Sequence, residues 1–327
     1  MAIFTPVSHD EAAAFLATHD LGGLIAMEGI VEGVENTNYR LDTSVGRFIL
    51  TLFEGRTDAA SLPFCLGLTD HLAERGYPAA RVMRNRSGAR IGEINGRPAA
   101  ILEWRDGVWL RRPGAPDVAL AGRRLADLHR LGADFPLRRA NPVGPPAWRD
   151  LARRCAERAG EADQPMLESL VAELDRAEAV FEGAARLPGG AIHADYFPDN
   201  VLFANRDIGG VIDFYFACDG AYVYDLGIAL NAWGFDAEGR PDREAMGAFV
   251  RGYEQGRRLS RAEREALPAL AAASALRFTL TRLHDRLFHD PAWVVTPKDP
   301  APFFRRIAFH AAADADTYGL APADGVP

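Results

Sequence analysis

The residues best suited to chemistry lie in the stretch His193-Ala-Asp195-Tyr-Phe-Pro-Asp199-Asn200, and Ile212-Asp213-Phe214 follows it. Together they set out two carboxylates and one carboxamide in the order Asp195, Asn200, Asp213. Phosphoryl transfer needs a positioned hydroxyl and a Mg²⁺ ion held by carboxylate and amide oxygens. We therefore expect Asp195 to orient the hydroxyl that is phosphorylated, and Asn200 and Asp213 to hold Mg²⁺.

The residues that separate these side chains predict a β-hairpin. Asn200-Val-Leu-Phe-Ala is typical of a strand, residues 205–210 of a turn, and Val211-Ile-Asp-Phe of a second strand. Such a hairpin would bring Asn200 and Asp213 to the same end of the pair, near one ion. A single Asp or Asn commonly shapes a turn through its own side chain, so the interpretation depends on the three residues together.

Length and composition describe an ordinary globular chain. It has 327 residues, enough for two hydrophobic cores, of which 48% are hydrophobic and 25% charged. The N-terminal residues lack the pattern of a signal peptide, and no apolar run reaches the roughly 18 residues of a membrane helix. We expect a cytoplasmic protein without a membrane partner.

Charge and cysteine content narrow the classes of partner. A net charge of -8 argues against a nucleic-acid groove, which would be basic. Cys65, Cys155 and Cys218 lack the spacing of a metal site or a disulfide framework, so we expect packing residues. Lys298 is the only lysine. Small-molecule partners are favoured, and the sequence carries no signal for an oligomeric state.

The first hundred residues predict a small antiparallel sheet. Ser8 and Glu11 have the spacing of a capping box that begins a short helix. A strand-loop-strand-turn-strand pattern follows between residues 29 and 53, then a helix over 62–75 and a hairpin over 90–103. A turn rich in glycine and asparagine can bring backbone N–H groups close to phosphate oxygens. Four residues of this turn are candidates for binding a nucleotide: Gly33, Asn36, Thr37 and Asn38.

The rest of the chain is predicted to be mostly helical. Residues 104–107 look like a crossing between two lobes, and the backbone near Glu103 and Arg105 is where an adenine edge could be recognised. We therefore expect an α+β fold with a nucleotide-binding lobe over 1–103 and a helical lobe over 104–327 that carries the catalytic loop and the acceptor site. The predicted helices cover 117–131, 147–160, 165–185, 222–235, 242–256, 260–290 and 300–317.

These motifs resemble the aminoglycoside phosphotransferase and choline kinase superfamily. The resemblance rests on His193-Ala-Asp195 with Asn200, on Ile212-Asp213-Phe214, on Tyr224-Asp225-Leu226-Gly227 and on Ala126-Asp-Leu-His129. It implies a bilobal protein-kinase-like fold that uses ATP and Mg²⁺. Independently of the resemblance, His193 could carry a proton, but we expect it to brace the loop by hydrogen bonding. Asp225 is then either a residue that steadies this loop or a helix cap, and His129 is expected in the core.

Within that superfamily the chain is most similar to bacterial homoserine kinases. The similar segments are Gly33-Val-Glu-Asn-Thr-Asn-Tyr39, Phe48-Ile-Leu-Thr-Leu-Phe-Glu54 and Thr296-Pro-Lys-Asp-Pro-Ala-Pro-Phe-Phe-Arg-Arg306. The resemblance implies phosphorylation of the side-chain hydroxyl of L-homoserine to O-phospho-L-homoserine, a step of threonine biosynthesis.

One position departs from the broad superfamily. Kinases of this fold place a lysine on the third strand to hold the ATP phosphates, and here Thr51 stands in that place. Backbone amides of residues 33–38, Mg²⁺ or an arginine such as Arg56 must then bind the phosphates. Homoserine kinases of this type are similar in having threonine there.

A zwitterionic acceptor such as L-homoserine needs a cation for its carboxylate and an acid for its ammonium group. Arg277, Arg282 and Asp285 are spaced to share one side of the late helix, and Asp219 is a second candidate for the ammonium. A solvated charged face is the alternative interpretation of the helix residues.

Two other functions compete with this one. The same chemistry could act on another acceptor, such as an aminoglycoside, choline or a methylthioribose-like sugar. Alternatively, without a lysine in the first lobe, the chain could be a nucleotide-binding regulator that does no chemistry. The presence of Asp195, Asn200 and Asp213 together argues against the regulator, because a binding scaffold does not need a carboxylate to orient a hydroxyl.

Overall fold

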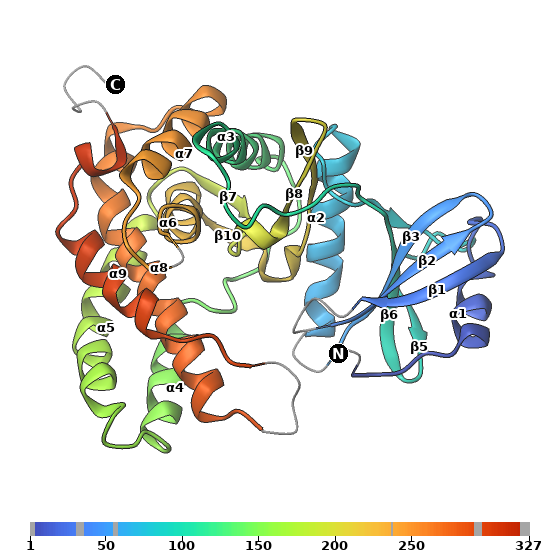
Figure 1. The fold of residues 1–327 in the computed structure, drawn as a ribbon, viewed down its shortest axis with the longest axis horizontal. Helices are drawn as coiled ribbons and strands as arrows, with labels where there is room; N and C mark the ends of the chain where they lie inside the picture. The colour runs from blue at the N-terminus through green and yellow to red at the C-terminus, as the bar shows by residue number, and fades with distance from the viewer. Residues whose placement is uncertain (1–3, 31–35, 55–57, 237, 291–295, 321–327) are drawn as a thin grey trace.

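The structure is a computed structural model that describes residues 4–30, 36–54, 58–236, 238–290 and 296–320. It consists of a small lobe built on an antiparallel sheet and a larger, mostly helical lobe (Figure 1). The predicted α+β bilobal architecture is therefore confirmed. The division at residue 103 stays a proposal, since β6 ends at Glu103 and the next helix begins at Ala115.

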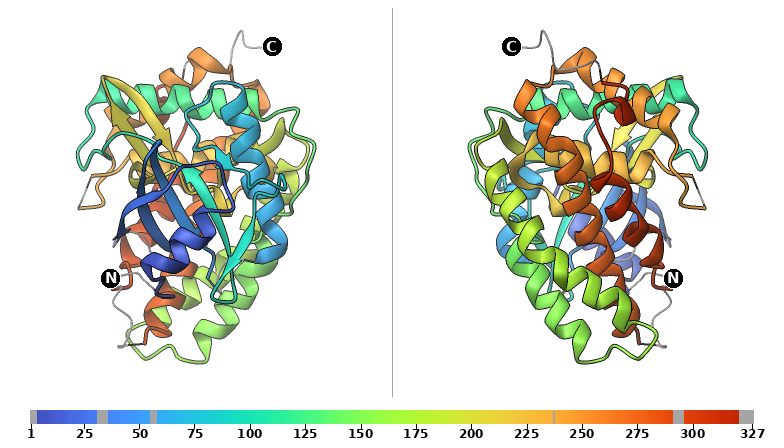
Figure 2. Two further views of the ribbon diagram at one scale, coloured as in Figure 1. Left: turned by 90° about the vertical axis from the view of Figure 1, so that its right-hand side faces the viewer. Right: turned by 90° about the vertical axis from the view of Figure 1, so that its left-hand side faces the viewer.

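The small lobe is a six-stranded sheet in the order β1-β2-β3-β6-β4, with β5 paired to β6. The helix α1 (His9–Leu16) begins with the predicted capping box of Ser8 and Glu11. It lies over one face of the sheet, where Leu16 packs with Leu41 and Leu50 (Figure 2). The strands are β1 (Leu24–Ile30), β2 (Thr37–Thr43), β3 (Gly46–Leu52), β4 (Val82–Met83), β5 (Gly92–Ile94) and β6 (Arg97–Glu103).

The helix α2 (Leu62–Glu74), preceded by the short turn η1 (Ala59–Ser61), joins the two lobes. Its Leu62 and Leu66 pack against Ala100 of the sheet. Its Phe64, Cys65, Leu68 and Leu72 belong to the main core of the helical lobe. Because one helix contributes to both cores, the lobes share buried surface as well as a linker.

The linker that follows β6 runs close to the hairpin of β8 (Val201–Ala204) and β9 (Asp207–Val211). Val108 and Phe203 exchange two backbone hydrogen bonds of 3.0 and 2.8 Å. A Cβ atom at Gly209 would lie 2.2 Å from the carbonyl oxygen of Asp106. Glycine is therefore required there, because any side chain would push the linker away from the hairpin.

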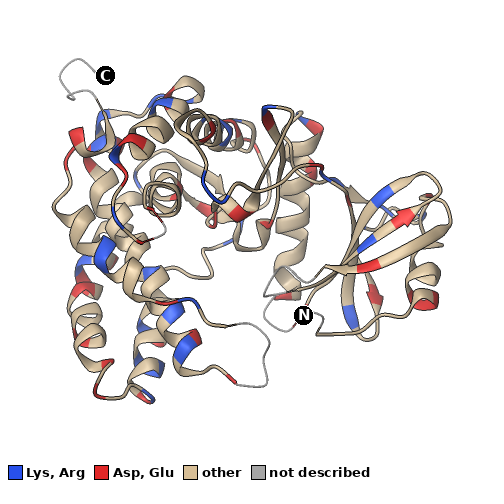
Figure 3. Cartoon of the chain, in the orientation of Figure 1, with Lys and Arg blue, Asp and Glu red and all other residues tan. Residues whose placement is uncertain are grey.

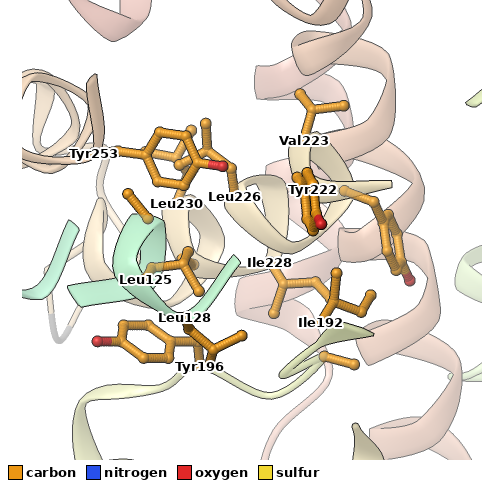
Figure 4. Close-up of a cluster of buried hydrophobic side chains, with 14 of the residues drawn as sticks. Leu125, Leu128, Ile192, Tyr196, Tyr222, Val223, Leu226, Ile228, Leu230 and Tyr253 are labelled. Atoms are coloured by element: carbon orange, nitrogen blue, oxygen red, sulfur yellow. The ribbon is translucent and has the colours of Figure 1, made fainter. Parts of the chain in front are cut away.

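The helical lobe is centred on α6, which is buried along almost its whole length. Leu125 and Leu128 of α3, together with Ile192 and Tyr196 near the catalytic loop, gather around it (Figure 4). The helices are α3 (Ala115–Leu131), α4 (Pro145–Ala156), α5 (Gln164–Ala184), α6 (Tyr222–Trp233), α7 (Arg243–Gly256), α8 (Arg261–Leu287) and α9 (Ala301–Ala311). Cys65, Cys155 and Cys218 are free and buried, as predicted for packing residues.

Two local predictions are wrong. The turn is only Asn205-Arg206, both with positive φ, and the second strand is β9 rather than residues 211–214. Gly209 and Gly210 suggested a turn but lie inside the strand, next to the linker. The last helix ends at Ala311 instead of 317, and a separate turn, η4 (Asp316–Tyr318), follows it.

A second small sheet was not predicted. It pairs β7 (Gly189–Ile192) with β10 (Cys218–Ala221), and the predicted catalytic residues lie between these two strands in the sequence. Within the described ranges, no helix is long and apolar enough to cross a membrane.

His310 makes the stability of the α9 region depend on pH. Burial lowers the pKa of this histidine to about 3, and its ring lies between the hydroxyl of Tyr318 and the side-chain oxygen of Asn231. Below the ordinary value of 6.5 the unfolded chain takes up a proton that the folded chain refuses. Stability contributed by neutral His310 is therefore lost as pH falls from about 6.5 toward about 3.

We predict that His310→Gln is less stable than the wild type at pH 7 but loses stability less steeply on acidification. The difference in slope should reach about 1.4 kcal/mol per pH unit. Thermal unfolding of both proteins between pH 7 and 5, at constant ionic strength, measures it. Parallel stability curves for the two proteins would show that His310 does not titrate on unfolding.

Candidate active site

The backbone brings the three predicted catalytic residues together at one end of the β8–β9 hairpin. The side-chain nitrogen of Asn200 donates to the carbonyl oxygen of Asp195 at 2.9 Å and to its carboxylate at 3.3 Å. The N–H of Ile212 donates to the carbonyl oxygen of Asn200 at 3.0 Å. Asp213 follows directly, so its carboxylate is carried by a peptide that is bonded to the catalytic loop.

His193 fastens this arrangement from the other side. Its Nε2 lies 3.0 Å from the carbonyl oxygen of Ile212. Burial lowers the pKa of the imidazole, although the charges of Asp225 and Asp195 act in the opposite direction. A neutral ring that donates from Nε2 fits this contact. These are the contacts of a residue that braces the loop.

Asp213 has a left-handed backbone, with φ 64° and ψ 60°. Among residues with a Cβ atom, Asp and Asn adopt this conformation most readily. Backbone strain of this kind occurs at sites where the direction of a side chain matters. The turn η3 (Phe214–Phe216) begins immediately afterwards.

Ala194, the residue before Asp195, is held by a buried ion on each side. Its φ is 60°, in the left-handed region. Its N–H donates to Oδ1 of Asp225 at 2.8 Å, and its carbonyl oxygen accepts from Nη1 of Arg277 at 2.6 Å. Both charged side chains are almost completely buried. The direction of the Asp195 side chain is therefore set by two charges that reach the preceding residue.

Asp225 is the end of a buried polar chain. It also accepts from the N–H of His193 at 2.9 Å and lies 2.9 Å from Nε2 of His129. The Nδ1 of His129 lies 2.7 Å from the hydroxyl of Tyr253. His129 is fully buried, as predicted for a core residue. Asp225 thus steadies the catalytic loop from within α6.

Competing effects set the protonation states of Asp225 and His129. Burial alone would raise the pKa of Asp225, but the hydrogen bond and charge of His129 and the N–H of His193 outweigh it, and the pKa is lowered. Burial lowers the pKa of His129, and the carboxylate offsets this only in part. An ionised Asp225 that accepts from a neutral His129 satisfies both directions.

Asp195 is half-buried, and the protein around its carboxylate removes part of the hydration of that group. Burial raises its pKa, while the guanidinium of Arg277, His193 and the ammonium of Lys298 act to lower it. A desolvated carboxylate is a better proton acceptor than one in water. This environment suits a group that must accept or orient a hydroxyl proton.

The predicted nucleotide residues separate onto the two faces of the sheet. Asn38 and Thr51 are directly paired, and the Thr51 hydroxyl donates to Oδ1 of Asn38 at 2.7 Å. They share the face of Ala100, toward α2. The Thr37 hydroxyl is on the opposite face and donates to Glu54 at 2.7 Å. The hydroxyl of Thr37 is therefore used to stabilise the strand end.

Of the remaining residues of this prediction, Asn36 lies directly before β2, and Glu103 and Arg105 lie at the linker. Oδ1 of Asn36 accepts from the N–H of Glu54 at 3.2 Å. Gly33 and Arg56 lie outside the described residues. Glu103 and Arg105 lie 3.6 Å apart and line a cavity of about 410 Å³, and Nε of Arg105 donates to the carbonyl oxygen of Gly209.

The four residues predicted to bind the acceptor do not form one binding site, because most of them have separate partners. Arg277 is committed to Ala194 and is 1% exposed, so it does not reach a substrate. Asp219 already pairs with Arg138 at 2.7 Å and accepts from the N–H of Arg139. Asp285 lies against His284, 3.7 Å away. Arg282 lies close to the charges of Asp195 and Asp199.

The structure adds residues that sequence reasoning did not assign to the site. The aromatic ring of Phe303 on α9 packs against Phe197 of the catalytic loop, and the guanidinium groups of Arg282 and Arg306 each lie 4.1 Å from its centroid. Lys298 lies 3.8 Å from Asp199. The sequence held two signals: Lys298 is the only lysine, and Lys298, Phe303 and Arg306 all lie in the segment 296–306 that resembles homoserine kinases.

A model of the phosphotransferase enzyme family matches residues 26–263. This chain belongs to that family. As a phosphotransferase of this family it is an ATP-dependent small-molecule kinase. Its fold is shared by the microcompartment-associated aminopropanol kinase, with a TM-score of 0.69 and 21% identity over 98% of this chain and 99% of that one. Amicoumacin kinase hAmiN gives 0.68 and 14% over 97% and 96%.

The phosphotransferase also has similar relatives over its full length. The homoserine kinase of Methylobacterium sp. (strain 4-46) is 46% identical over 98% of this chain and 100% of its own. The homoserine kinase of Methylorubrum populi is 47% identical over 98% and 99%. The family resemblance seen in the motifs is thus confirmed.

The left-handed Ala194 gives a test of the two-sided clamp. We predict that Ala194→Gly keeps the activity and is as stable as the wild type or up to about 1 kcal/mol more stable, because glycine adopts this backbone without strain. Ala194→Val should lose activity and stability together. Steady-state kinetics and thermal unfolding of both variants measure this. A glycine variant that lost activity would show that the Ala194 methyl group itself matters.

Proposed function

We propose that this phosphotransferase transfers the γ-phosphate of ATP to the side-chain hydroxyl of L-homoserine. The observation that carries the proposal is the 46% identity to a homoserine kinase across nearly the whole of both chains. The catalytic-loop geometry supports it, since Asp195, Asn200 and Asp213 are tied by backbone and side-chain hydrogen bonds. The product, O-phospho-L-homoserine, would feed threonine biosynthesis.

In the proposed reaction the hydroxyl oxygen of the acceptor attacks the γ-phosphorus. The bond from that phosphorus to the oxygen that bridges the β- and γ-phosphates breaks, and ADP leaves with the electron pair. Asp195 orients the hydroxyl and receives its proton. A desolvated carboxylate held by Ala194 and Asn200 is suited to this task.

The residues present also fit Mg²⁺, which prefers carboxylate and amide oxygens. The side-chain nitrogen of Asn200 is directed at Asp195, so its Oδ1 is available to a metal. Asp213 would supply the carboxylate. When bound, Mg²⁺ would neutralise charge on the phosphates. The residues themselves do the positioning, because Ile212 links Asn200 to Asp213.

Arg282 is the best-placed group to bind the carboxylate of the acceptor. It stacks on Phe303, and its Nη1 donates to the carbonyl oxygen of Asp299 at 3.3 Å. Within the described chain it pairs with no carboxylate side chain. Burial lowers the pKa of its guanidinium to about 10, so the group remains charged at neutral pH. Basic residues recur along α8 and α9 in Figure 3.

The function is tested by measuring ADP release with a panel of acceptors. We expect saturable turnover with L-homoserine, on the order of 1 to 100 per second, and little with aminoglycosides or choline. Asp195→Asn should lower kcat at least about 100-fold and leave ATP binding intact. Equal background rates with every acceptor would disprove the proposal, and an Asp195→Asn enzyme of normal kcat would disprove the assignment of Asp195.

The role of Arg282 is tested with a substrate that lacks the carboxylate. Arg282→Met should raise KM for L-homoserine by about 10-fold to 100-fold, because a charge-assisted hydrogen bond is lost. KM for 3-aminopropanol should hardly change. Arg305→Met, on the exposed side of α9, removes the same charge and is the matched control. Equal effects of Arg282→Met on both acceptors would show that Arg282 acts elsewhere.

A further inference from the structure

Among the described residues of the first lobe, which do not include Arg56, nearly every arginine is already paired with a carboxylate. In the described part of that lobe, Arg81 lines the cavity near Glu103. The other described arginines there each pair with a carboxylate; they are Arg40, Arg47, Arg75, Arg84, Arg86, Arg90 and Arg97. A cation from another part of the chain is then a candidate to act on the transferred phosphoryl group beside Mg²⁺.

Two buried arginines near the catalytic loop are already committed. Nη1 of Arg277 donates to the carbonyl oxygen of Ala194, and Arg306 donates to the carbonyl oxygen of Asn231. They are 1% and 8% exposed, so neither can move to follow a phosphoryl group. Arg282 is stacked on Phe303. The side chain of Lys298, by contrast, is mostly exposed.

Lys298 lies where such a group is needed. Its Nζ is 3.8 Å from Oδ2 of Asp199, and Asp199 directly precedes Asn200. Its charge reaches Asp195, because it is among the groups that act on the pKa of that carboxylate. The side chains of Lys298 and Asp199 are 63% and 50% exposed. An ion pair this exposed contributes little stability, so a phosphate can replace the carboxylate at small cost.

The backbone that carries Lys298 is anchored even though its side chain is exposed. The next residue, Asp299, accepts from Arg282 through its carbonyl oxygen and from the N–H of Ala301 through its carboxylate at 3.0 Å. The helix α9 begins at Ala301. The lysine therefore has a fixed base and a flexible four-carbon stem, which suits a point charge that follows a moving group.

We propose that Lys298 contacts the phosphoryl group during its transfer and supplies, from the helical lobe, the cation that related kinases place on the third strand. The inference rests on the proposed function for the identity of the acceptor. As the bond to ADP breaks and the bond to the acceptor oxygen forms, the ammonium group exchanges Asp199 for phosphoryl oxygens. Lys298 stabilises their charge and takes no proton.

The first experiment compares Lys298→Met, Lys298→Arg and Asp199→Asn with the wild type. We expect Lys298→Met to lower kcat about 100-fold, with KM for L-homoserine within about 3-fold, and Lys298→Arg to recover part of the loss. Asp199→Asn, which removes the ion pair but keeps the ammonium, should keep kcat within about 3-fold. Arg305→Met controls for the loss of one exposed positive charge on this side of the molecule.

Two results of this experiment would overturn the proposal. A raised KM for L-homoserine at normal kcat would mean that Lys298 binds the acceptor carboxylate. An Asp199→Asn variant as impaired as Lys298→Met, with no further loss in the double variant, would mean that the ion pair only stabilises the loop.

The second experiment measures binding instead of turnover. Calorimetry with Mg²⁺, ADP and aluminium fluoride, which together imitate the transferred group, should show about 100-fold weaker binding to Lys298→Met, whereas Mg²⁺ and ADP alone should bind equally to both proteins. Equal binding of the fluoride complex would overturn the proposal. The measurement needs no acceptor, so it separates a failure of the Lys298 inference from a failure of the homoserine assignment.

Discussion

The structure depends on one constraint: a residue with a Cβ atom, Ala194, must stay in a left-handed conformation, which fixes the direction of the Asp195 side chain. Two buried charges enforce it, because Asp225 accepts from the N–H of Ala194 and Arg277 donates to its carbonyl oxygen. A buried ion without a partner is costly. If the loop relaxed, Asp225 on α6 and Arg277 on α8 would lose these partners while still buried. This cost keeps the carboxylate of Asp195 in place.

This constraint extends through most of the helical lobe. Asp225 is held by His129 of α3, and His129 by Tyr253 of α7, so the direction of Asp195 depends on the packing of three helices. The other end of the loop is tied through Ile212 to Asn200 and His193. Substrate contacts are thus free to vary, because the carboxylate is oriented by the core and not by the pocket.

The sequence predicted what depends on short-range pattern. The capping box at Ser8 and the hairpin that brings Asn200 next to Ile212 and Asp213 follow from local chemistry. It failed where a distant segment decided the role of a residue. Gly209 and Gly210 lie in a strand that packs against the linker residues Arg105 and Asp106. Arg277 donates a hydrogen bond to Ala194 because the helix α8 packs against the loop. Nothing within a few residues of Gly209 or Arg277 reveals these partners.

The same reasoning explains how a kinase of this fold can lack a lysine on its third strand. A lysine there must be oriented by its own lobe, but Thr51 is instead buried and bonded to Asn38. A cation on the α8–α9 connection is attached to the lobe that also carries Asp195 and Asn200. Its position relative to the acceptor therefore does not depend on the angle between the lobes. Placing the charge with the catalytic loop makes phosphoryl stabilisation and hydroxyl orientation properties of the same lobe.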